Sequence, residues 1–149
     1  MKRVFCGVVL MCLLPTIVMA STCASPTEQS ALNHRALQSQ LMVSALACGQ
    51  QDNYNQYMSK FKRHLTGQQA TMQKYFKRVY TGSGKREMTS FLTALANESS
   101  VRSLQVDSDK YCSSSDKLFD KLLDSRSKKV SKIANKRQFV SLHDVEKCE

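Results

Sequence analysis

The stretch from Tyr54 to Val79, YNQYMSKFKRHLTGQQATMQKYFKRV, decides the fold class of this chain. Its apolar side chains recur every three or four residues over about 26 positions, which is the spacing of one face of an α-helix. They are Tyr54, Tyr57, Met58, Phe61, Leu65, Met72, Tyr75, Phe76 and Val79. The pattern predicts a long amphipathic helix that opens after Asp52 or Asn53. Gly67 costs such a helix about 1 kcal/mol relative to alanine, which allows a kink or a break there.

A helix is also predicted immediately before this stretch. Apolar residues recur at helical spacing over residues 27–48. Thr27-x-x-Ser30, with Glu28 early in the run, provides a start, and Gly49 provides a C-terminal stop. We therefore expect a first helix over residues 27–48.

Two more helices are predicted after the long one. The clearest loop of the chain, residues 81–84, precedes a helix over residues 85–104, in which we place Val101 on the inward face. A fourth helix is expected to be capped by Ser113, with Asp116 in the capping-box position three residues later. The short connections favour antiparallel neighbours.

The distribution of proline supports an all-α fold. The chain has no proline after Pro26, which argues against a turn-rich β sandwich. We expect a compact bundle of four to five helices cross-linked by disulfide bonds, with its main body at residues 21–125. A basic C-terminal segment, residues 126–149, is predicted to be helical in part and to be tied down by Cys148.

The first twenty residues have the pattern of a signal peptide. Lys2 and Arg3 precede an apolar run at residues 4–19 that is too short for a typical membrane span, and Val18-Met19-Ala20 supplies small residues for cleavage. We predict cleavage after Ala20. Because residues 1–20 carry two basic residues and no acid, the mature chain has 20 basic and 12 acidic residues, a net charge of +8.

Four cysteines remain after this cleavage: Cys23, Cys48, Cys112 and Cys148. In an oxidising compartment an even set predicts disulfide bonds, and four cysteines allow three pairings. Cys48 ends the first predicted helix and Cys112 begins the fourth, which favours a Cys48–Cys112 bond. Cys23 and Cys148 lie near the two chain termini, which are often close together in a compact domain, so a Cys23–Cys148 bond is favoured as well. Lipid attachment at Cys23 is the alternative, although Thr22 stands where glycine or alanine is expected. It would leave an odd number of cysteines.

Positive charge is concentrated in two runs that contain no acid, residues 60–86 and 126–137. Such runs predict a surface for an anionic or acidic partner, although a solvated helix surface explains basic composition equally well. Export and the lack of a nucleic-acid-binding motif disfavour nucleic acid. The candidate binding residues are Lys60, Lys62, Arg63, Lys74, Lys77, Arg78, Lys128, Lys129, Lys132, Lys136 and Arg137.

Catalytic and metal-binding patterns are sparse. The chain lacks G-x-S-x-G, H-E-x-x-H, Walker A and paired-cysteine zinc motifs. The three histidines, His34, His64 and His143, are isolated in the sequence, and each is expected to be solvated or at the edge of the core. We therefore expect no enzyme activity, no metal and no cofactor.

Two segments, HRALQSQLMVSALAC at residues 34–48 and FLTALANESSVRSL at residues 91–104, together with Tyr111-Cys112, resemble a group of small exported bacterial proteins. The resemblance covers about residues 30–125. It implies export, a helical body and a cysteine in each of two helices, matched here by Cys48 and Cys112. It implies no activity.

These observations together predict a non-catalytic exported binding protein of the bacterial cell envelope, in the periplasm or secreted. Its expected mode of action is through a protein partner. The alternative is electrostatic binding of an anionic envelope polymer or lipid, which the two basic runs favour.

Overall fold

Six helices make up the computed structural model, which describes residues 22–148. They are α1 (Pro26–Cys48), α2 (Gln51–Val79), α3 (Gly84–Leu104), α4 (Ser108–Leu123), α5 (Ser127–Ala134) and α6 (Arg137–Val140). The all-α prediction is confirmed, with four long helices and two short ones. The predicted signal peptide lies outside the described residues.

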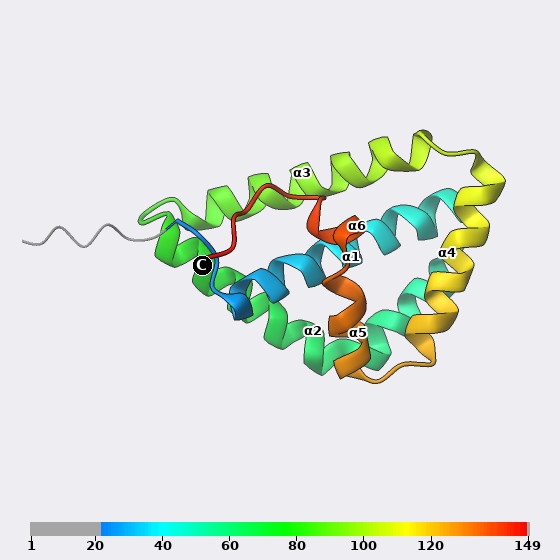
Figure 1. Ribbon diagram of the computed structural model, residues 1–149, viewed down its shortest axis with the longest axis horizontal. Coiled ribbons are helices and arrows are strands. Elements are labelled where there is room, and N and C mark those ends of the chain that lie inside the picture. The colour runs from blue at the N-terminus through cyan, green and yellow to red at the C-terminus, as the bar shows by residue number, and fades with distance from the viewer. Residues whose placement is uncertain (1–21, 149) are drawn as a thin grey trace, which may run out of the picture.

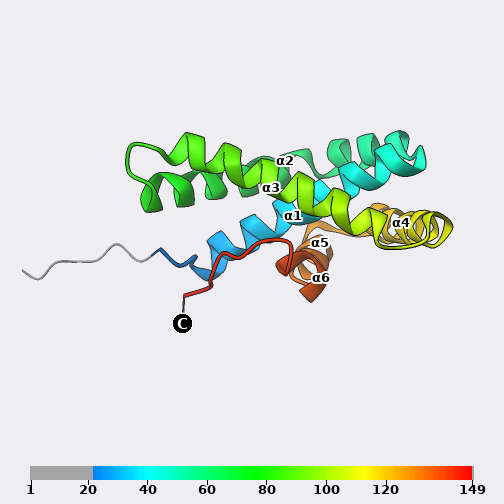
Figure 2. The same ribbon diagram turned by 90° about the horizontal axis from the view of Figure 1, so that it is seen from above.

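Helix α1 is the centre of the molecule (Figure 1). The antiparallel helices α2 and α3 lie along one side of it, and α5, α6 and the C-terminal tail lie on the opposite side (Figure 2). Helix α4 crosses the end of the bundle where α1 finishes. As a result α1 is buried on most of its circumference, including polar side chains such as Asn33 and His34.

The start of α1 differs from the prediction. The capping box is formed by Ser25 and Glu28: the Ser25 hydroxyl accepts from the Glu28 backbone N–H, and the Glu28 carboxylate accepts from that of Ser25. Pro26 occupies the first turn, where its missing N–H costs nothing. The C-terminal stop is Gly49, as predicted, with φ of +67° in the left-handed region that suits glycine.

The start of α4 also differs from the prediction. The cap is Asp107, whose carboxylate accepts from the Lys110 backbone N–H at 3.2 Å, and Ser113 lies inside the helix. Asp116, assigned above to a capping box, instead accepts a hydrogen bond from the Gln50 side chain at 2.7 Å. Helix α4 is therefore held to the α1–α2 connection by polar contacts of its middle turns.

One hydrophobic core joins α1, α2 and α4 to α5 and α6. Its largest fully buried members include Tyr57 on α2, Phe119 on α4 and Phe139 on α6. A smaller cluster under the α2–α3 end contains Leu32, Met72, Tyr75 and Phe76. Val101, which was expected to face inward, is 50% exposed because the end of α3 projects past the core.

Both predicted disulfide bonds are present. Cys48–Cys112 joins the end of α1 to α4, and Cys23–Cys148 joins the two ends of the described chain. Beside the second bond, the backbone of Ala24 pairs in parallel with that of Lys147. The C-terminal tail is thereby fixed next to the start of α1.

Two glycines offer a matched test of the packing. Helix α2 runs through Gly67 without the break that glycine allowed, and a Cβ there would meet no atom within 4 Å. Gly67→Ala is expected to raise the free energy of unfolding by up to about 1 kcal/mol. A Cβ on Gly84 would lie 2.7 Å from the Phe76 carbonyl oxygen, so Gly84→Ala is expected to cost about 1–3 kcal/mol.

Urea unfolding followed by circular dichroism would measure both effects. A loss of stability in Gly67→Ala would indicate that α2 is broken at this position. Unchanged stability in Gly84→Ala would show that α2 and α3 are not in close contact at their turn.

Candidate functional site

All eleven predicted binding cations are exposed, but they form two surfaces. Those at residues 60–78 lie on α2, and those at residues 128–137 lie on α5 and at the start of α6. Helices α2 and α5 are on opposite sides of α1 (Figure 2). The two basic runs therefore lie on different sides of the molecule, although α2 and α5 meet in its interior, where His64 Nε2 lies 3.5 Å from Ser131 Oγ.

Two of the α2 cations hold the fold together. Arg78 forms an ion pair with Glu28 at 2.8 Å and donates to the Cys23 carbonyl oxygen at 3.0 Å. Lys60 donates to the carbonyl oxygen of Leu123 at the end of α4. These contacts join α2 to the N-terminal segment and to α4, so neither cation is fully available to a ligand.

The other cations of α2 face solvent. Arg63, Lys74 and Lys77 fall within about 60° of one another at 100° per residue, on the side of α2 opposite its apolar stripe. In the part of the chain that the structure describes, the ion pairs involve only Arg78, Arg86 and Arg102. Arg63, Lys74 and Lys77, together with Lys62, therefore have no acidic partner among residues 22–148.

The turn between α2 and α3 continues this charged surface. It is hollowed, and the hollow is lined by Lys77, Tyr80 and Lys85 together with the two glycines of the turn and neighbouring side chains of α2 and α3. Tyr80 is 39% exposed, and its ring stacks on Phe76 with 5.9 Å between centroids. Arg86 follows, but its charge is partly offset by Glu87 at 3.0 Å.

We define the α2 basic face as Lys62, Arg63, Lys74 and Lys77 with Tyr80 and Lys85 at the turn. Tyr80 and Lys85 were not among the predicted binding residues. Lys85 belongs to the same acid-free run, 60–86, and that continuity was the signal that could have found it. The position of Tyr80 beside it depends on the geometry of the turn, which the sequence does not specify.

The three histidines are not isolated in space. His34 Nε2 lies 3.2 Å from His64 Nε2 and 3.0 Å from Ser131 Oγ, which places residues of α1, α2 and α5 in one polar cluster. His143 Nε2 lies 2.8 Å from Asn33 Oδ1. The expectation of single solvated or core-edge histidines is therefore wrong for His34, which is 1% exposed.

Burial determines the protonation of this cluster. Loss of solvent lowers the pKa of His34 to about 4, with a further contribution from the neighbouring His64. Loss of solvent also lowers the pKa values of His64 and His143. Because two imidazole nitrogens face each other at 3.2 Å, one must donate and the other accept, so the arrangement requires a neutral imidazole.

The donors and acceptors of the cluster are arranged as in a polar contact that holds helices together. The hydroxyl of Ser131 is within reach of His34, as in a nucleophile–base pair, but the other ring nitrogen of His34 is buried without a partner that could orient the ring. Within residues 22–148, no three histidine, cysteine or acidic side chains are grouped so that they could hold a metal ion. The arrangement connects α1, α2 and α5 through polar contacts.

Over the same described range, no helix is both long enough and apolar enough to span a membrane. No protein family, curated protein or solved structure matches the chain. Its function must therefore be inferred from its exposed charges, its pockets and its contacts.

Proposed function

We propose that this protein is a non-catalytic, exported binding protein of the bacterial cell envelope. In this proposal it binds an anionic envelope polymer or lipid through the α2 basic face, without a metal or cofactor. One observation carries the proposal: the cations of this face are exposed, have no acidic partner in the described part of the chain, and continue into a hollow lined by Lys77, Tyr80 and Lys85.

The length of the face favours a repeating anion over a single small one. From Arg63 to Lys77 a helix rises about 21 Å, at 1.5 Å per residue. This distance spans several phosphate or carboxylate groups of a polymer or several lipid headgroups. Each exposed lysine or arginine near an anionic membrane contributes about 1 kcal/mol, so several together produce useful affinity.

The proposed location rests on the signal-peptide pattern and the disulfide bonds. Two disulfide bonds persist most readily in an oxidising compartment such as the periplasm or the medium. Phosphate- and carboxylate-bearing polymers and anionic lipids are therefore the anions that the α2 basic face would meet.

Binding through exposed charges is expected to depend strongly on salt. Raising NaCl from about 50 to about 500 mM shortens the screening length from more than 10 Å to less than 5 Å, so affinity should fall at least about tenfold. Co-sedimentation with vesicles containing phosphatidylglycerol would measure this for lipid. Displacement of the protein from these vesicles by soluble lipopolysaccharide, at both salt concentrations, would measure the same salt dependence for a polymer.

Zwitterionic phosphatidylcholine vesicles provide the control and should not bind. Binding that is equal at the two salt concentrations, or absent from both anionic ligands, would contradict the proposal. Preference for one ligand would identify the source of the anion.

A protein partner is the second candidate, and a different surface favours it. Large apolar side chains are exposed where α3 ends and turns into α4: Val101, Val106 and Leu104, the last 85% exposed. Exposed apolar residues gathered at one place are typical of protein-binding sites. A protein partner that binds there should no longer bind the Leu104→Ser variant, and it should still bind a variant in which the α2 basic face is altered.

A further inference from the structure

Arg35 on α1 is a half-buried cation with one buried nitrogen that no described residue satisfies. The Nε atom of Arg35 is shielded from solvent and has no hydrogen-bond partner among the described residues. No acidic side chain among residues 22–148 forms an ion pair with Arg35. A buried donor without an acceptor destabilises the fold, and more so when the group is charged. Native proteins rarely leave such a group unsatisfied, so an acceptor from outside the chain is expected.

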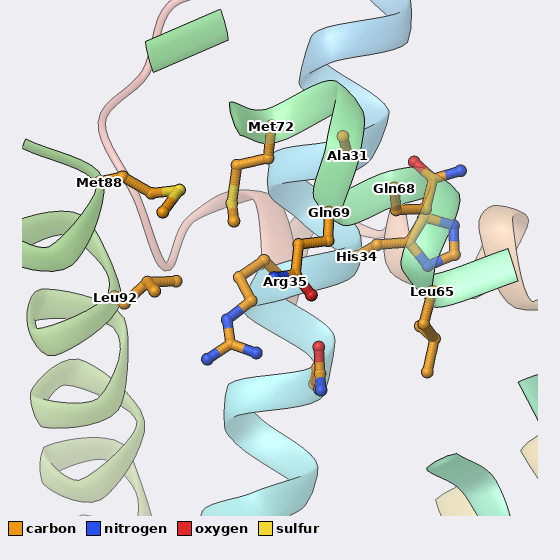
Figure 3. Close-up of a pocket in the computed structure, with 10 residues that line it drawn as sticks. Ala31, His34, Arg35, Leu65, Gln68, Gln69, Met72, Met88 and Leu92 are labelled. Atoms are coloured by element: carbon orange, nitrogen blue, oxygen red, sulfur yellow. The ribbon is translucent and has the colours of Figure 1, made fainter. Parts of the chain in front are cut away.

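The Arg35 side chain lines a pocket of about 100 Å³ between α1, α2 and α3 (Figure 3). Its guanidinium extends from α1 toward α3, while the His34 ring turns the other way, beside Leu65 and Gln68. Met72 on α2 and Met88 on α3 close one side of the pocket. Gln38, Gln68 and Gln69 supply the amide groups of the lining.

The lining has two chemical halves. One half supplies a guanidinium and glutamine amides and contains no acid, which favours an anion. The other half is apolar, and its methionines can adapt to the shape of a small ligand. A phosphate or sulfate would leave the apolar half unused, whereas an amphipathic ligand would fill both.

We propose that this pocket binds a small carboxylate with a short apolar chain, held by Arg35 as its counter-ion. A guanidinium matches a carboxylate in planar, two-point hydrogen bonding. A 150 Å³ cavity accepts the six carbon atoms of benzene, so 100 Å³ holds about four non-hydrogen atoms, the size of acetate. Because the pocket is partly open to solvent, the end of a chain as long as that of butyrate can extend from it. Met88 lines both this pocket and the hollow at the α2–α3 turn, but the Arg35 site includes none of the cations of the α2 basic face and does not depend on the function proposed for that face.

The methionines allow a direct test with butyrate as the probe. The mature chain has four, Met42, Met58, Met72 and Met88, so methyl-labelled protein should give four resolved signals in NMR spectra. Titration at pH 7 should shift the Met72 and Met88 methyl signals saturably. The Met42 signal, whose residue does not line the pocket, should stay fixed.

Two comparisons separate a carboxylate site from a simple apolar cavity. Butanol, the neutral analogue, should bind at least about tenfold more weakly than butyrate, because it cannot pair with the guanidinium. Arg35→Gln should weaken the affinity for butyrate by a similar factor. Arg126→Gln, which removes the same charge from the exposed start of α5, should leave the affinity unchanged.

Leu92→Phe keeps Arg35 and fills the pocket, so it should abolish the butyrate shifts. This variant and the butanol comparison decide the question if Arg35→Gln does not fold. Unshifted Met72 and Met88 signals, equal binding of butanol and butyrate, or full affinity in folded Arg35→Gln would each overturn the proposal. The first of these results would mean that the pocket holds only water.

Discussion

Replacing both Cys48 and Cys112 with serine is expected to lower the free energy of unfolding by about 4 kcal/mol. The bond closes a loop with a sequence separation of 64 residues, and its removal gives the unfolded chain the corresponding conformational freedom. Total stability of a domain is about 5–15 kcal/mol, so the loss would leave the fold marginal. The Gln50 contacts with Ser115 and Asp116 would remain to hold α4 near α1.

Urea unfolding is the appropriate measurement, followed by circular dichroism at 222 nm because the chain has no tryptophan. Ser113→Ala, an exposed change next to Cys112, serves as the control and should stay within about 0.5 kcal/mol of the wild type. A double serine variant as stable as the wild type would show that the bond does not constrain the unfolded chain.

Acidification from pH 6.5 to pH 4 is expected to remove about 3 kcal/mol of stability through His34 alone. The ordinary histidine pKa of 6.5 applies to the unfolded chain, whereas burial lowers the pKa of His34 to about 4 in the folded protein. The unfolded state therefore takes up a proton first as the pH falls. The stabilisation is complete above pH 6.5 and is lost progressively down to pH 4.

His34→Gln is the variant that isolates this effect. Carboxylates titrate in the same way in both proteins, so the difference between their stability–pH curves reports the histidine. Urea midpoints at pH 7.5, 6.5, 5.5 and 4.5 should fall less steeply in the variant. Parallel curves would mean that burial does not hold His34 neutral in the folded protein.

The helical stripes and the disulfide pairing could be predicted because they depend on local spacing and on where helices end. Apolar residues of α2, such as Phe61 and Phe76, are buried as their spacing indicated. The predicted start of α4 was wrong because several serines and aspartates could each cap this helix. In the structure the Asp107 side chain accepts the capping hydrogen bond, whereas Ser113 lies inside the helix. Local sequence does not distinguish between such candidates.

The candidate site was predicted less completely, for a physical reason. Exposure of the α2 lysines follows from helix periodicity. The contact of His34 with Ser131 joins residues 97 positions apart, and depends on how α5 packs against α1. The missing acceptor at Arg35 is a property of three helices packed together, and no local pattern predicts it.

The most direct test of the central claim compares two sets of charge reversals in vesicle binding. Arg63→Glu, Lys74→Glu and Lys77→Glu together alter the α2 basic face. Lys128→Glu, Lys129→Glu and Lys132→Glu make the same change in net charge on α5. We expect the α2 variant to lose at least about tenfold in affinity for phosphatidylglycerol vesicles at low salt, and the α5 variant to stay within about threefold of the wild type. Equal losses would show that net charge alone governs binding, and full binding by the α2 variant would contradict the assignment of this face.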